Sequence, residues 1–117
     1  MFDLDNITEE AATCNDLEEV VMGLIINSGQ ARSLAYTALK KAKEGDLAAA
    51  HQLMAQSREA LNAAHLVQTQ LIEDDQGEGK IPVTLVLVHA QDHLMTSMLA
   101  RELISELIEL HEKLQNQ

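Results

Sequence analysis

Three ionisable side chains lie in one short, otherwise apolar stretch of the chain, residues 87–97. They are His89, Asp92 and His93, and their neighbours include Leu, Val, Ala and Met. An ionisable group in apolar surroundings is costly unless it is paired, binds a metal or reacts. We therefore expect the function of the chain to depend on this stretch.

A metal site is one chemistry that these residues allow. On a helix, His89 and His93 share a face because they are four residues apart, which is a known spacing for zinc ligands, and Asp92 can act as a third ligand. The stretch lacks the glutamate of a His-Glu-x-x-His metalloprotease, and no further ligand motif follows it. This interpretation gives a metal-binding helical-bundle protein with a His/His/Asp site.

Nucleophilic transfer is the second chemistry. An exposed neutral imidazole can attack a phosphoryl group, form a phosphohistidine and pass the group on. This reaction needs donors that hold the phosphoryl oxygens, and Gln91, His93 and Thr96 are candidates. A third interpretation is that both histidines are buried and hydrogen-bonded and carry no chemistry.

Asp92 poses a separate question, because it lies at the edge of an apolar stripe formed by residues such as Val88 and Met95. A carboxylate there cannot stay charged and unpaired without cost. If three copies of the chain meet on a threefold axis, protonation or a shared divalent cation with oxygen ligands would relieve the repulsion. Alternatively, the side chain turns to solvent or caps a partner.

Composition predicts one all-α domain. The chain has 117 residues, 46% of them hydrophobic but only 2% aromatic, with one Pro and five Gly. A core of Leu, Ile, Val, Met and Ala suits packed helices, whereas a sheet protein of this length needs more turns.

Charge and the chain start exclude several classes of protein. A net charge of -11 argues against nucleic acid and favours a basic partner. The single Cys14 excludes an intramolecular disulfide. The start has no signal-peptide pattern, and the longest apolar run, 81–88, is too short to span a bilayer. These features predict a cytoplasmic protein without membrane insertion.

Hydrophobic periodicity predicts an antiparallel three-helix bundle at residues 16–117, preceded by a mobile acidic tail at residues 1–15. The first helix is expected from Asp16 to Lys43, followed by a tight turn in which Gly45 is left-handed and Asp46 caps the second helix, which ends near Glu73. Residues 74–80 form a loop, and Pro82 suits the first turn of the third helix. The β-branched run 83–88 reads locally as a strand, but no partner strand exists, so we predict helix there.

The third helix is apolar on more than one side. A three-helix bundle buries only one side, which leaves an apolar face exposed on a monomer. The residues of this face are Leu85, Val88, Met95, Leu99 and Leu103. We expect a homo-oligomer built around this helix, the alternative being that the tail folds over it.

Two segments, Glu18 to Ser33 (EEVVMGLIINSGQARS) and Leu85 to Ser97 (LVLVHAQDHLMTS), resemble the lactose/cellobiose-type enzyme IIA of the bacterial phosphoenolpyruvate-dependent sugar phosphotransferase system. The resemblance covers nearly all of residues 17–114 and is strongest to the N,N'-diacetylchitobiose branch of that family. It implies a homotrimer of three-helix bundles. It also implies a phosphotransferase component that accepts phosphate from the carrier protein HPr and passes it to a cysteine of the IIB component.

The IIB component then phosphorylates a β-disaccharide, N,N'-diacetylchitobiose or cellobiose, that enters through the IIC permease. By the same resemblance, His89 matches the phosphorylated histidine, and Gln91 and His93 flank the active site. Asp92 matches a buried aspartate on the trimer axis that can hold Mg²⁺ or another divalent cation in a structural role.

Overall fold

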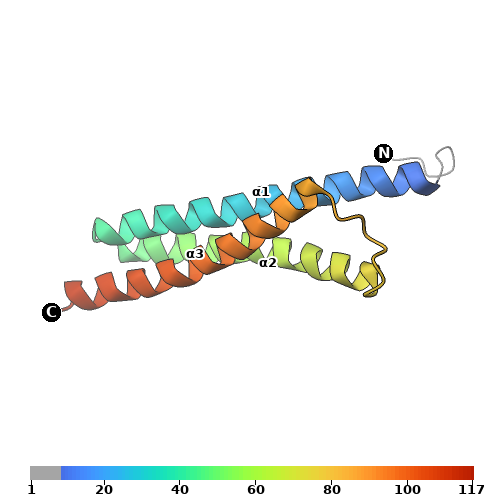
Figure 1. Cartoon of the computed structure of the whole chain (residues 1–117). Coiled ribbons are helices and arrows are strands. Elements are labelled where there is room, and N and C mark those ends of the chain that lie inside the picture. The colour runs from blue at the N-terminus through green and yellow to red at the C-terminus, as the bar shows by residue number, and fades with distance from the viewer. Residues whose placement is uncertain (1–8) are drawn as a thin grey trace.

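The computed structural model describes the backbone of residues 9–117 and the side chains of residues 17–117. This part of the chain forms three long α-helices and no β-strand. The helices are α1 (Glu9–Lys43), α2 (Leu47–Asp75) and α3 (Leu85–Gln115), and they alternate in direction (Figure 1). The predicted antiparallel three-helix architecture is confirmed for a single chain.

The start of α1 differs from the sequence prediction. The helix begins at Glu9 rather than near Asp16, so residues 9–15 are helical and do not belong to a tail. Glu and Ala, which dominate residues 9–12, are strong helix formers, and negative charge is favourable near a helix N-terminus. The remainder of the predicted tail, residues 1–8, lies outside the described residues.

The turn between α1 and α2 follows the sequence prediction. Gly45 has a φ of 90°, which a side chain would disfavour. The carboxylate of Asp46 accepts a hydrogen bond from the backbone N–H of Ala49 at 3.1 Å and so caps α2. Three lysines lie in the last turn of α1, where their charge complements the helix dipole.

The start of α3 is later than predicted. Pro82 does not lie in the first turn of the helix, because α3 begins at Leu85 and Thr84 is its N-cap. The Thr84 hydroxyl accepts from the N–H of Leu87 at 3.2 Å. A proline keeps the residue before it out of helical conformation, so Ile81 and Pro82 belong to the connection from α2. Residues 85–88 are helical. This confirms the prediction of helix for them, although their composition is typical of a strand.

Two apolar clusters form the core. One lies near the start of α3 and contains Val21, Leu24, Ala64, Leu71, Leu87, Ala90 and Leu94. The other lies near its end and contains Ala35, Ala38, Ala42, Ala50, Met54, Ile104 and Ile108. The alanines allow close packing of α1 on α2. By contrast, α2 and α3 meet over a much smaller contact, although both pack along α1.

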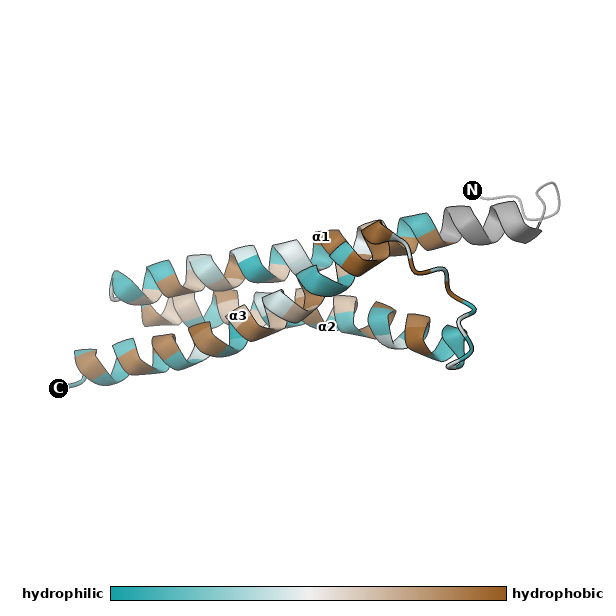
Figure 2. Cartoon of the chain, viewed as in Figure 1, coloured by the Kyte–Doolittle hydropathy of each residue, from teal (hydrophilic) through white to brown (hydrophobic). Residues whose placement is uncertain are grey.

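An apolar face of α3 remains uncovered in the single chain, as the sequence predicted. Its side chains are between 42% and 87% exposed. We call these residues the α3 apolar face: Leu85, Val88, Met95, Leu99, Leu103, Leu107, Leu110 and Leu114. Figure 2 shows hydrophobic turns recurring along α3 as far as its C-terminal end. Large hydrophobic side chains exposed in this number along one helix indicate an interface.

Candidate functional site

His89 and His93 lie side by side near the start of α3. Their ring centroids are 4.9 Å apart and the ring planes are inclined by 82°, so that the edge of one ring meets the face of the other. His89 is exposed, whereas His93 is half-buried. The buried Ala90 and Leu94 anchor this part of α3 in the core and thereby turn His89 outward. An exposed imidazole can act as a nucleophile, and a second ring beside it can contact the group that is transferred.

The half-buried ring of His93 has a buried nitrogen, Nδ1, that makes no hydrogen bond among the described residues. Buried polar atoms are nearly always hydrogen-bonded, and unpaired ones occur often at functional sites. The interpretation of both histidines as buried and hydrogen-bonded does not hold.

Gln91 is directed to the opposite side of the helix. Its Oε1 accepts a hydrogen bond from Nε2 of Gln68 on α2. Because successive helical residues are about 100° apart, Gln91 and His89 point in nearly opposite directions. Within one chain, Gln91 thus does not flank the histidine pair. The pairing of Gln68 with Gln91 was not predicted, since nothing in the spacing of residues 68 and 91 indicates it.

Thr96 is also not a free donor. Its hydroxyl donates to the carbonyl oxygen of Asp92, one turn earlier, at 2.7 Å. The sequence makes Thr96 a candidate donor to phosphoryl oxygens, but in the structure the helix already uses its proton. Of the three candidate donors, His93 is the one that the structure places beside His89.

Asp92 is exposed and lies among residues of the α3 apolar face. Among the described side chains, no three of His, Cys, Asp or Glu come close enough to hold a metal ion. The alternative interpretation, a His/His/Asp zinc site, is therefore not supported within a single chain. The reason is geometric, because Asp92 and His93 are adjacent and diverge by about 100° around the helix.

Comparison with known proteins identifies the family. Residues 19–112 match the family model described as the lactose/cellobiose-specific IIA subunit of the PTS system. The chain belongs to this family. The match includes the histidine pair and Asp92, and it covers most of α1 and α3 and all of α2.

Curated relatives extend over nearly the whole chain. The chain is 76% identical over 114 residues to the PTS system N,N'-diacetylchitobiose-specific EIIA component of Escherichia coli (strain K12), covering 97% of this chain and 98% of that protein. It is 41% identical over 107 residues to the cellobiose-specific EIIA component of Lactococcus lactis subsp. lactis, covering 91% of each.

Solved structures of IIA subunits share the fold. The IIA(Chitobiose) chain in its solution complex with HPr from Escherichia coli matches with a TM-score of 0.75 and 81% identity, covering 85% of this chain and 96% of that one. The cellobiose-specific enzyme IIA from Bacillus anthracis matches with a TM-score of 0.82 and 43% identity, covering 86% and 92%. Within the described residues, no helix has the length and apolar character needed to cross a bilayer.

Proposed function

We propose that this IIA subunit is a phosphocarrier that accepts a phosphoryl group from phospho-HPr on His89 and passes it to a cysteine of the IIB component. The observation that carries the proposal is the exposed imidazole of His89, held at the edge of the half-buried His93. The solved complex of a similar chain, IIA(Chitobiose), with HPr supports the choice of donor.

The transfer is a displacement at phosphorus. A ring nitrogen of neutral His89 supplies its electron pair to form a nitrogen–phosphorus bond, while the bond to the donor breaks and its electron pair stays with the donor. His93 lies where its ring can donate a hydrogen bond to a phosphoryl oxygen. In the second step a thiolate of the IIB component forms a sulfur–phosphorus bond, and the imidazole of His89 leaves with the electron pair.

The phosphoryl group must survive until transfer, so water should not be activated beside it. None of the ion pairs between described residues joins His89 to a carboxylate. A neighbouring carboxylate could act as a general base toward water. Among the described residues, no ion pair thus holds a general base against His89, which supports a carrier.

The names of the relatives support a substrate class. We assign the chain to uptake of a β-disaccharide, N,N'-diacetylchitobiose or cellobiose, through the IIC permease, and to the cytoplasmic side of that permease. The 76% identity to a diacetylchitobiose-specific component favours the first sugar. The net charge of -11 suits basic surfaces on its protein partners.

The α3 apolar face is proposed to pack around a threefold axis in a homotrimer. Asp92 of three chains would then converge on that axis. A carboxylate is a hard oxygen donor, so the site suits Mg²⁺ or another hard divalent cation, with Asp92 as the residue that would hold it. Such an ion would neutralise the converging charge and so serve assembly, and its ligands would have to come from more than one chain, because no three metal-ligating side chains come together among the described residues.

The test of the phosphocarrier function is labelling with phosphoenolpyruvate, enzyme I and HPr. His89→Gln should abolish labelling and keep its helicity by circular dichroism, whereas His65→Gln, on an exposed part of α2, should label fully. The wild-type phosphate should be acid-labile and base-stable and map to residues 87–101. Labelling that persists in His89→Gln would refute the assignment of His89.

A further inference from the structure

A groove between α2 and α3 lies away from the histidine pair. It has a volume of about 520 Å³ and is formed by residues 51–59 of α2 and 101–112 of α3. Along α3 it begins twelve residues after His89, or about 18 Å at 1.5 Å per residue. It opens where α2 and α3 make little contact. The proposed phosphocarrier reaction makes no use of it.

Arg101 is the central residue of this groove. Its Nη2 donates to the backbone carbonyl of Met54 at 3.1 Å, which bridges α3 to α2. Its Nε is buried and has no hydrogen-bond partner among the described residues. Burial lowers the pKa of Arg101, and the like charge of Arg58 lowers it further. The side chain therefore holds a costly, incompletely satisfied positive charge.

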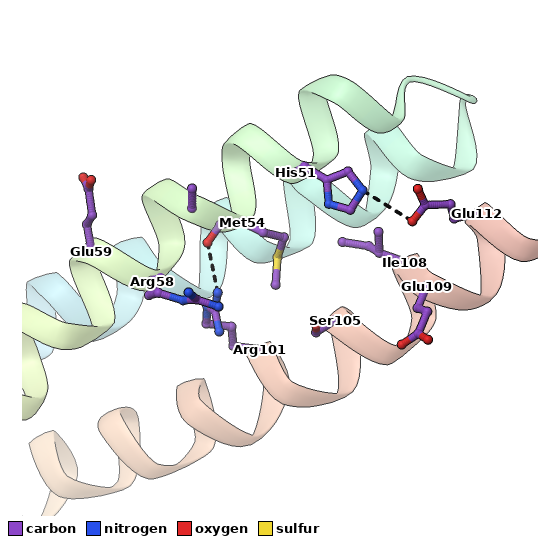
Figure 3. Close-up of a pocket in the computed structure, with 10 residues that line it drawn as sticks. His51, Met54, Arg58, Glu59, Arg101, Ser105, Ile108, Glu109 and Glu112 are labelled. Atoms are coloured by element: carbon purple, nitrogen blue, oxygen red, sulfur yellow. Dashed lines mark hydrogen bonds and ion pairs between the residues drawn. The ribbon is translucent and has the colours of Figure 1, made fainter.

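Arg58 increases this positive charge. In Figure 3 its side chain extends from α2 toward Arg101, and the two like charges are close enough for Arg58 to lower the pKa of Arg101. Neither arginine takes part in the ion pairs found between described residues. This is unexpected in a chain with 19 acidic and only 8 basic residues.

The carboxylates around the groove do not neutralise the pair. Glu112 lies 3.4 Å from Nε2 of His51, and Glu109 lies 3.7 Å from Nζ of Lys113. Figure 3 shows Glu59 directed away from the arginines. The centre of the groove thus carries two cationic groups whose repulsion an anion would relieve.

We propose that this groove binds the phosphate group of a small phosphorylated metabolite, with the guanidinium groups of Arg58 and Arg101 as its main contacts. Two neighbouring guanidinium groups carry two positive charges and several N–H donors. A phosphate dianion, with two negative charges and several oxygens, matches them better than a carboxylate, which has one charge and two oxygens. Ser105, one turn after Arg101, lines the same groove and adds a hydroxyl donor. The groove is within the size range of small-molecule sites and exceeds what phosphate alone would fill.

The experiment is a nuclear magnetic resonance titration of the full chain with inorganic phosphate, glycerol 3-phosphate, acetate and glycerol at constant ionic strength. We expect saturable shifts of the Arg101 Nε–H signal and of backbone amides in residues 54–58 and 101–109. Glycerol 3-phosphate should bind at least as tightly as inorganic phosphate. Acetate should bind about tenfold more weakly, and glycerol should produce no shift.

Substitutions inside and outside the groove test whether phosphate binds to Arg58 and Arg101. Arg58→Gln should weaken phosphate binding by about tenfold or more, because it removes charge-assisted hydrogen bonds. Its side chain is exposed, so we expect the fold to persist. Lys40→Gln removes the same charge from an exposed position on α1, outside the groove, and should bind like wild type. Arg101→Lys keeps the charge but loses the guanidinium geometry and should also bind more weakly.

Three outcomes would overturn the proposal: shifts that grow linearly without saturation, equal responses in Arg58→Gln and Lys40→Gln, or acetate binding as tightly as phosphate. A fourth is a change of oligomeric state in Arg58→Gln without any phosphate response. That result would assign the groove to a contact between chains. None of these outcomes depends on whether His89 carries phosphate.

Discussion

The chemistry proposed for this chain depends at the residue scale on two imidazole rings in different surroundings. His89 is exposed and free to approach a partner protein, while His93 is half-buried with an unpaired Nδ1. Exposure suits the nucleophile, and partial burial suits a residue that holds an oxygen of the transferred group in a fixed position. The two histidines are therefore expected to respond differently to substitution.

We predict that His93→Ala keeps His89 as the labelled residue but lowers the rate of phosphoryl transfer by about tenfold. Loss of one hydrogen bond in the transition state, worth about 1.4 kcal/mol, has this effect. Rapid-quench measurement of transfer from phospho-HPr tests it. Thr96→Val is the control and should keep the wild-type rate, because its hydroxyl donates to the Asp92 carbonyl. Complete loss of label in a folded His93→Ala would make His93 the acceptor instead.

The spacing of residues in a sequence predicts contacts within one helix but not contacts between two helices. The spacing of His89 and His93 sufficed to place them on one face, because helical geometry fixes side chains four residues apart. The contact of Gln68 with Gln91, and that of Arg58 with Arg101, depend on how two helices cross. No periodicity in the chain encodes such a crossing. Both contacts therefore became visible only in three dimensions.

At the scale of elements, the connection between α2 and α3 positions the histidine pair. The Asp75 carboxylate accepts from the backbone N–H of Ile81 at 2.9 Å and from that of Gly79 at 3.3 Å. These bonds fold the connection back toward α2 just before Thr84 caps α3. His89 follows this cap by five residues, so Asp75 contributes to its placement.

We predict that Asp75→Ala lowers the free energy of unfolding by roughly 1–3 kcal/mol, as for lost hydrogen bonds to a charged group. The Ile81 amide should also exchange with solvent faster. Urea unfolding and hydrogen exchange measure the two effects. Asp74→Ala is the control, because Asp74 is exposed and accepts only from Gln70 within α2. Equal effects of the two changes would show that the connection does not depend on Asp75.

The helix boundaries show which local signals are reliable. Gly45 and Asp46 predicted the first turn correctly, because a left-handed residue and a cap act on their immediate neighbours. Asp16 and Glu19 have the spacing of a capping box, yet α1 begins at Glu9. Strong helix formers upstream prolong a helix past a possible cap. The fixed φ of Pro82 suits a first helical turn, but the hydroxyl of Thr84 caps α3 two residues later, and this cap sets the boundary.

At the scale of the whole molecule, the exposed leucines of α3 predict assembly. We expect Leu99→Glu to dissociate the proposed trimer, because three charges would enter an apolar contact. Leu66→Glu makes the same change at a side chain that is 70% exposed on α2 and lies outside the α3 apolar face, so it should leave assembly intact. Sedimentation velocity distinguishes the species. A trimeric Leu99→Glu would place the interface elsewhere.

The carboxylate of Asp92 is expected to weaken the proposed trimer through repulsion between its three copies. If three carboxylates converge on the axis, Asp92→Leu removes their repulsion and extends the α3 apolar face. Replacing buried ionic groups with apolar ones often stabilises proteins by about 1–4 kcal/mol. The variant should therefore stay trimeric to lower protein concentrations than wild type. Assembly of the wild type should weaken when a chelator removes divalent cations, and assembly of Asp92→Leu should not respond.

Asp74→Leu, an equivalent change at an exposed residue on α2, controls for a general effect of hydrophobicity and should not strengthen assembly. Dissociation of Asp92→Leu into monomers would show that the carboxylate makes a favourable contact across the interface. The axial placement of Asp92 would then be wrong. The exposure of the α3 leucines would still require an interface, with Asp92 paired at its edge instead of facing its own copies.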